Sequence, residues 1–242
     1  MRVLVVVPAY NEQQALGGLL GELAAVKLDD GDALATVVVD DGSRDRTREI
    51  AAERGVRVLR LSHNLGIGGA VQAGLRIAHR ERFDCAVQLD GDGQHPPSEL
   101  ARLLAPLREA EPPDLVVGSR YHGGGGFRST VLRRLGSWWL CVVLRVIARV
   151  HASDPTSGFR VYGPRALALF DDTYPYDFPE PESLAVARAA GLRIAEVRVA
   201  MRERQGGQSS IAGLFGAYYM VKVTLAILLA YMRARGRTRR EN

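Results

Sequence analysis

Short apolar runs rich in β-branched residues alternate with helix-like segments through the first half of the chain. The runs cover residues 2–7, 35–39, 56–61, 84–89 and 115–118. Between them, apolar residues recur at helical spacing, and further helices are expected near Asp45, over 69–79 and after Pro97 with Ser98 as N-cap. Continuous apolar strands are typical of parallel sheets covered on both faces. The alternation therefore predicts an α/β fold with a mostly parallel sheet flanked by helices.

Polar clusters follow three of these predicted strands. They are PAYNE at 8–12, DDGS at 40–43 and DGDGQH at 90–95. Ligands of parallel α/β sheets bind beyond the carboxyl ends of the strands, where these clusters fall. We therefore expect the functional site along this edge.

The DGDG segment places two carboxylates, Asp90 and Asp92, on the same side of the chain. Their like charges raise each other's pKa unless a cation or hydrogen-bond donors lie between them. Carboxylate oxygens suit Mg²⁺ or Mn²⁺, and such an ion could bridge Asp92 to a diphosphate. An EF-hand lacks its further acid here, and a zinc site lacks partners for His95. A simple Asp-Gly turn is the alternative.

The segment NLGIGGAV at 64–71 nearly matches the GxGxxG loop of dinucleotide-binding folds. An NAD-dependent oxidoreductase is therefore a rival hypothesis. Val71 occupies the third glycine position, and the loop follows the third predicted strand instead of the first. Both features count against that hypothesis.

Six motifs in order carry a resemblance to a known family: PAYNE, DDGS, NLGIGGAV, DGDGQHPP, VGSRY and DPTSGFR. Together they resemble the inverting family 2 glycosyltransferases of GT-A fold. The most similar branch is the polyprenyl-phosphate glycosyltransferases, which includes dolichol-phosphate mannose synthase. The resemblance covers residues 3 to about 210.

For the nucleotide-sugar donor, the resemblance implies a set of residues around the base and ribose. These are Pro8, Ala9, Tyr10, Glu12 and Asp41. It also implies that Asp90, Asp92 and Gln94 bind Mg²⁺ or Mn²⁺, and that Arg120 lies near the donor diphosphate. The Gly residues around Asp92 depart from the family's usual Ala-Asp-Leu and predict a looser turn.

For the acceptor phosphate, the resemblance implies four residues: Arg133, Ser137, Arg204 and Ser209. Spacing does not separate Arg133 from Arg134 for this role. Arginine suits it because its planar fork binds phosphate oxygens in pairs. Asp154 is the candidate base if one acts, and otherwise orients the acceptor or the sugar. Glu182 matches an acid of the family, with helix capping as the competing explanation.

The implied activity is transfer of one hexose, from a GDP-mannose or UDP-glucose type donor, to a polyprenyl phosphate with inversion. The QxxRW motif of processive members is absent, so one sugar per turnover is expected. One alternative is a family 2 transferase with a saccharide or another non-lipid acceptor. A second is a catalytically silent nucleotide-sugar-binding subunit of a membrane complex.

Two segments indicate a membrane surface. Residues 131–150 form a basic helical pattern with Trp138 and Trp139, the latter grouped with the apolar side on a helical wheel. An ordinary helix packed on the sheet is the alternative. Residues 211–232 are apolar and long enough to span a bilayer, but Lys222 lies in the middle.

An arginine-rich tail follows that apolar segment. Its members are Arg233, Arg235, Arg237, Arg239 and Arg240. Because this tail and a nucleotide-handling domain both belong in the cytoplasm, we expect a helix on the membrane surface, with its arginines on anionic lipids, in preference to a span. A membrane-protein partner or a homo-oligomer is a further option; nucleic acid is not an expected partner.

The expected organisation is a glycosyltransferase domain at 1–210, with the interface helix inserted at 131–151, followed by an apolar helix and basic tail at 211–242. The apolar run before Pro8 is too short for a secretory signal, and Cys85 and Cys141 lack CxxC spacing. We expect both thiols to be buried and reduced, and the protein to work at the cytoplasmic face of the membrane.

Overall fold

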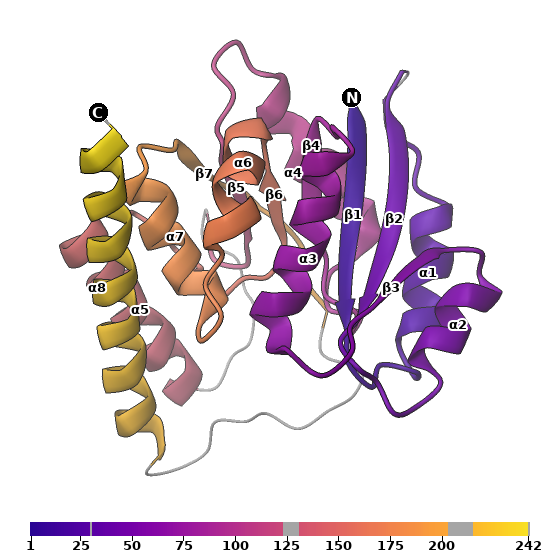
Figure 1. The fold of residues 1–242 in the computed structure, drawn as a ribbon, viewed down its shortest axis with the longest axis horizontal. Coiled ribbons are helices and arrows are strands. Elements are labelled where there is room, and N and C mark those ends of the chain that lie inside the picture. Colours follow the sequence, from indigo (N-terminus) through magenta and orange to yellow (C-terminus); the bar gives the residue numbers. More distant parts are fainter. Residues whose placement is uncertain (30, 123–130, 203–214, 242) are drawn as a thin grey trace.

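A computed structural model of the chain describes residues 1–29, 31–122, 131–202 and 215–241. In the last two segments, side chains are described for 135–202 and 218–237. Seven described strands form one sheet in the order β3-β2-β1-β4-β6-β5-β7 (Figure 1). They are β1 (Arg2–Ala9), β2 (Ala33–Asp40), β3 (Arg57–Arg60), β4 (Cys85–Gln88), β5 (Leu115–Ser119), β6 (Arg160–Tyr162) and β7 (Ile194–Arg198).

Helices cover both faces of this sheet (Figure 1). They are α1 (Leu16–Ala24), α2 (Thr47–Glu53), α3 (Gly66–Arg80), α4 (Leu100–Leu104), α5 (Val131–Ala148), α6 (Pro164–Thr173), α7 (Pro179–Ala189) and α8 (Phe215–Glu241). One hydrophobic core joins the sheet to α3, α5, α6, α7 and α8, and a second joins it to α1, α2 and α4. The mostly parallel α/β fold expected from the sequence is confirmed.

The central strand shows why the apolar runs lack polar alternation. In β1, Val3 and Val5 belong to one core, Leu4 and Val6 belong to the other, and all four are almost completely buried. Both faces of the strand are covered, so neither face needs polar side chains.

Five strands were expected, and all five form within one or two residues of the expected bounds. The sequence did not predict β6 and β7. β6 pairs antiparallel with both β4 and β5, and inserts between them. The Ser98 N-cap was wrong, because Ser98 lies inside a 3₁₀ turn, Pro97–Glu99, that precedes α4 without a side-chain capping bond.

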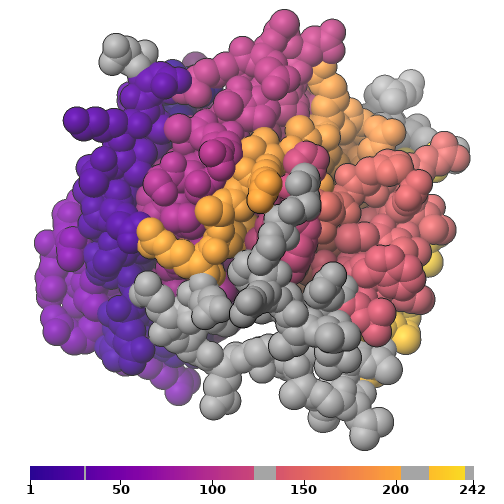
Figure 2. All heavy atoms as spheres, turned by 180° about the vertical axis from the view of Figure 1, so that it is seen from behind, coloured from indigo at the N-terminus to yellow at the C-terminus, as the bar shows by residue number. Residues whose placement is uncertain are grey.

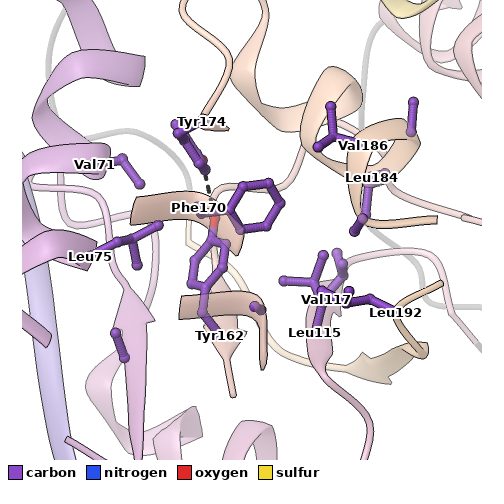
Figure 3. Close-up of a cluster of buried hydrophobic side chains, with 14 of the residues drawn as sticks. Val71, Leu75, Leu115, Val117, Tyr162, Phe170, Tyr174, Leu184, Val186 and Leu192 are labelled. Atoms are coloured by element: carbon purple, nitrogen blue, oxygen red, sulfur yellow. Dashed lines mark hydrogen bonds between the residues drawn. The ribbon is translucent and has the colours of Figure 1, made fainter. Parts of the chain in front are cut away.

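An aromatic cluster fills the core between β6 and α6 (Figure 3). Tyr162, Phe170 and Tyr174 meet edge to face, with ring centroids 5.2–6.3 Å apart. The Tyr162 hydroxyl donates to Oε1 of Gln88 at 2.9 Å. The core therefore contains a polar link to the last residue of β4, two positions before Asp90.

The three last long helices lie together at one side of the sheet (Figure 1). α8 packs along α7 and α5, and buries Val223 and Ile227. Trp139 of α5 donates from Nε1 to Oγ1 of Thr224 at 3.1 Å, and 43% of its surface stays exposed. None of the described helices has an apolar stretch long enough for a bilayer crossing.

Both cysteines are free thiols. Burial raises the pKa of Cys85 to about 12 and that of the half-buried Cys141 to about 11. The expected burial is complete for Cys85 and partial for Cys141.

Gly74 lets α3 approach the central strand. A Cβ at this position would lie 2.1 Å from Cγ1 of Val6. We expect Gly74→Ala to lower the free energy of unfolding by about 1–3 kcal/mol, since the β-branched Val6 cannot move within a packed core. Urea denaturation measures the change.

Gly18 in α1 provides the matched control, because an added Cβ there meets nothing within 4 Å. Gly18→Ala should raise the free energy of unfolding by about 0.5–1 kcal/mol through helix propensity. Equal effects of the two substitutions would contradict the close packing of α3 on β1.

Candidate active site

The turn after β4 lies against the end of β1. These strands are parallel neighbours, and the backbone N–H of Gly91 donates to the carbonyl oxygen of Pro8 at 3.3 Å. A Cβ on Gly91 would lie 3.1 Å from that oxygen and 3.5 Å from Cγ of Glu12. The close approach brings the Asp90–Asp92 turn beside the predicted base-binding residues.

Asp90 is held by the protein on both carboxylate oxygens. Nε2 of Gln88 donates to Oδ1 at 3.3 Å, and Nε2 of His95 lies 3.2 Å from Oδ2. Burial acts to raise the pKa of Asp90, but the interactions with His95, Gln88 and Arg160 outweigh it and the pKa lies below its usual value. Asp90 is therefore a fixed anion, and part of its side chain reaches the surface.

Gly158 allows a second backbone to approach Asp90. A Cβ on Gly158 would lie only 2.5 Å from Oδ2 of Asp90. The Gly of the DPTSGFR motif is thus required by the packing of that loop on the carboxylate.

Asp92 accepts a hydrogen bond at Oδ1 from the backbone N–H of Gln94, at 3.0 Å, and only 8% of its surface is exposed. The described residues contain no cluster of three His, Cys, Asp or Glu side chains able to hold a metal by themselves. Mg²⁺ commonly binds one or two carboxylates together with substrate phosphates. Asp90, Asp92 and Gln94 carry oxygens of the type that such an ion binds, and their metal-binding role stays a prediction.

The predicted nucleotide-binding residues also gather at this edge. Asp41, almost completely buried, accepts the N–H of Leu65 at 2.7 Å, and its own N–H donates to the carbonyl of Ala9 at 2.9 Å. Burial raises the pKa of Asp41, despite the hydrogen bonds it accepts at the start of α3. Tyr10 is exposed. Ala9 and Asp41 are therefore joined by a backbone hydrogen bond beside the exposed Tyr10, and the nucleotide-binding role of these residues stays a prediction.

Arg120 and Asp154 form a buried pair. Nε of Arg120 donates to Oδ2 of Asp154 at 2.6 Å, and Nη2 donates to Oδ1 at 2.7 Å. The Asp154 side chain is completely buried, and 10% of the Arg120 side chain is exposed. Burial alone would lower the pKa of Arg120, but the bond to Asp154 raises it. Both carboxylate oxygens are engaged, so the pair holds the guanidinium in place and leaves Asp154 poorly arranged to remove a proton.

The first turn of α7 contains two acids, Glu182, which the sequence singled out, and Glu180, which it did not. Glu182 accepts the backbone N–H of Phe178 at 2.7 Å, which is the helix-capping explanation given for it above. Burial raises the pKa of Glu180; the positive charge of Arg160 opposes this rise and the negative charge of Asp90 adds to it. Spacing in PEPESL does not distinguish these two acids, because the distinction comes from tertiary packing.

Arg160 fixes the position of that turn. It is fully buried and donates to the carbonyls of Ser157 and Pro155, and to Oγ of Ser183 at 2.7 Å. An arginine inside the apolar run FRVY was the available signal for this link. It joins the DPTSGFR loop to α7.

The segment after β7 returns to the Asp90–Gln94 turn. Figure 2 shows it as an orange strip crossing the magenta residues around α4. The N–H of Arg202 donates to the carbonyl of Gln94 at 2.9 Å. Ser137 is half-buried on α5. The Arg133 side chain, Arg204 and Ser209 lie outside the described part of the structure, so their roles stay predictions.

A model of glycosyl transferase family 2 matches residues 4–167 of the chain. The chain is 35% identical over 234 residues to undecaprenyl-phosphate mannosyltransferase of Micrococcus luteus, covering 93% of each protein. It is 32% identical to polyprenol monophosphomannose synthase of Mycolicibacterium smegmatis, covering 88% of this chain and 82% of the relative.

The fold is also similar to a solved structure of glucosyl-3-phosphoglycerate synthase from Mycobacterium tuberculosis, in complex with Mn²⁺, UDP and glucosyl-3-phosphoglycerate. The TM-score is 0.72 at 22% identity, covering 95% of this chain and 79% of the other. At this identity the likeness concerns the fold.

Asp154→Asn tests the buried pair. We expect the free energy of unfolding to fall by about 3 kcal/mol, because the substitution leaves the Arg120 charge without its buried partner. Urea denaturation measures this loss. Asp172→Asn, at an exposed ion pair with Arg76, should change stability by about 0.5 kcal/mol or less. Wild-type stability of Asp154→Asn would show that the pair is dispensable.

Glu180→Gln tests the half-buried acid through the pH dependence of stability. The folded protein raises the pKa of Glu180. Ionisation of Glu180 therefore lowers the free energy of unfolding as pH rises from the ordinary pKa of a glutamate through the raised pKa. Between about pH 4 and pH 7, the free energy of unfolding of Glu180→Gln should therefore exceed that of wild type by an amount that grows with pH. Exposed Glu53→Gln serves as control. A constant difference across this range would rule out the raised pKa.

Proposed function

The chain belongs to glycosyltransferase family 2, and on this premise we propose that it transfers one hexose from a nucleotide-diphosphate sugar to a polyprenyl phosphate with inversion. The observation that carries the proposal is the similarity to undecaprenyl-phosphate mannosyltransferase along 93% of both chains. The convergence of the Asp90–Asp92 turn with the end of β1 supports it. A GDP-mannose or UDP-glucose type donor is the expected substrate.

The donor is proposed to lie along the carboxyl edge of the sheet. Pro8, Ala9, Tyr10, Glu12 and Asp41 would border its base and ribose. Asp90, Asp92 and Gln94 would hold Mg²⁺ or Mn²⁺, which when bound would stabilise the charge on the departing diphosphate. The fixed orientation of Asp90 supports this assignment, because its carboxylate needs no reorganisation on binding.

Arg120 is proposed to face the donor diphosphate, with Asp154 as the residue that positions it. The geometry of the pair supports positioning over the base role considered from sequence. A phosphate monoester is ionised near neutral pH, so an acceptor phosphate oxygen can attack the anomeric carbon without a base. One C–O bond to the leaving diphosphate then breaks as the new bond forms on the opposite face.

Arg133 and Arg204 are proposed to bind the acceptor phosphate, with Ser137 and Ser209 beside them. Arg202, two residues before Arg204, is bound to Gln94 next to the Asp92 turn, which supports this assignment. A polyprenyl acceptor requires contact with a membrane. We propose peripheral association with its cytoplasmic face through α5 and α8.

The test measures radiolabelled sugar transfer from GDP-mannose and UDP-glucose separately, to undecaprenyl phosphate in detergent, with and without Mn²⁺. We expect metal-dependent label in the lipid fraction from one donor. Asp92→Asn should lower turnover by at least about 100-fold with an unchanged fold, because it removes stabilisation of the leaving group.

Exposed Asp172→Asn is the control and should retain full activity. Normal turnover by Asp92→Asn would refute the site assignment. Label transferred only to a water-soluble acceptor would refute the polyprenyl acceptor while keeping the reaction class.

A further inference from the structure

A groove of about 500 Å³ lies where the ends of α5 and α7 meet α8. Three arginines line it, one from each helix region: Arg149, Arg188 and Arg235. Tyr231 and the exposed Val146 also line the groove. Tyr231 and Arg235 belong to the half of α8 that leads to the C terminus, which Figure 1 marks.

The groove has an unbalanced positive charge. No acidic side chain lines it, and within the described residues none of the three arginines forms an ion pair with a carboxylate. Within the described residues, the guanidinium of Arg235 lies over the ring of Tyr231 and donates to its hydroxyl. Three guanidinium groups around one hollow favour an anion with several oxygens, such as a phosphate.

Helix ends explain part of this arrangement but not all of it. Arg188 lies in the last turn of α7, and Arg149 directly follows α5, so both interact favourably with the helix dipoles. Arg235 has no such reason to be there, because α8 continues to Glu241.

The backbone of Arg149 determines which substitution suits this position. This residue adopts φ 54°, in the left-handed region where glycine is the favoured C-terminal residue of a helix. The N–H of Val150 donates to the carbonyl of Leu144 at 3.2 Å, which completes that helix ending. Arg82, just after α3, has a similar φ of 56°, so this conformation shows that glycine suits the position and does not by itself assign a role to the guanidinium.

Five exposed apolar side chains on the two helices, here called the exposed apolar face, are Trp138 and Val146 on α5 and Leu225, Leu229 and Met232 on α8. Val146 also lines the groove. Val146 is 75% exposed, and Trp138 and Met232 are each 60% exposed. Figure 2 shows α5 in salmon at the molecular surface, with α8 at its edge. Apolar surface next to a basic groove matches the acyl region and headgroup of an anionic lipid, whereas a soluble phosphate would leave the apolar face unexplained.

We propose that Arg149, Arg188 and Arg235 bind the phosphate of an anionic lipid headgroup. Occupation of this groove lays the exposed apolar face on the bilayer, with α8 along the membrane surface. The inference deepens the proposed function, on which its membrane setting rests, by naming the residues that orient the enzyme.

The test is co-sedimentation of the full chain with vesicles of phosphatidylcholine, or of phosphatidylcholine with phosphatidylglycerol, without donor or acceptor. We expect the triple variant Arg149→Gly, Arg188→Gln, Arg235→Gln to lose binding to the anionic vesicles by about tenfold or more. A control with Arg48, Arg80 and Arg102 changed to Gln removes the same charge elsewhere, and should lose about twofold or less.

Arg149→Gly alone keeps the proposal testable if the triple variant folds poorly. Glycine suits the backbone there, so the thermal midpoint should stay or rise while anionic-vesicle binding falls. Equal losses in the triple and control variants would overturn the proposal, as would equal wild-type binding to both vesicle types.

Two further outcomes would also overturn it. One is that inorganic phosphate stabilises wild type, but not the triple variant, against unfolding while wild type does not bind vesicles. The other is a dimer by light scattering that the triple variant breaks while vesicle binding is unchanged. Sugar transfer in detergent is measured separately, so a groove that does not bind lipid can be distinguished from a proposed function that is wrong.

Discussion

The parallel register of β1 and β4 determines where the site forms. Val3 pairs with Cys85 and Val6 with Gln88, so the residues after β4 run beside the last residues of β1 and the Gly91 N–H meets the Pro8 carbonyl. A slip of one residue would turn every side chain of β4 to the other face of the sheet and move Asp90 away from this edge. The fully buried valines of β1 prevent that slip, because each belongs to one of two separate cores.

Several charged residues of the recognised motifs have a structural task alongside any chemical one. Asp154 neutralises Arg120 inside the protein, Glu182 caps α7, and Asp41 fixes the start of α3. Loss of activity on changing such a residue therefore has two explanations, and only a parallel measure of folding separates them. Asp92 is the clearer chemical candidate because of its place on the turn.

Local patterns predicted the parallel part of the fold well, since strands buried on both faces have a distinctive composition. They missed β6 because it is three residues long and contains Arg160, whose burial depends on partners in the 155–157 loop and α7. Motif order located the Asp90 and Asp92 turn, but not the pairing of Arg120 with Asp154, which are 34 positions apart. Glu180 was missed for the same reason, because two acids in one helical turn look alike until the neighbouring element is known.

The two thiols have a practical consequence for studying this protein. Cys85 is shielded by the sheet, and both Cys85 and Cys141 have pKa values raised by burial, to about 12 and about 11. Neither forms much thiolate near neutral pH, and the thiolate is the species that alkylates. A cysteine introduced at an exposed position of α8 would therefore react first with a maleimide fluorophore or spin label. The native chain thus serves as its own low-background scaffold for site-specific spectroscopy.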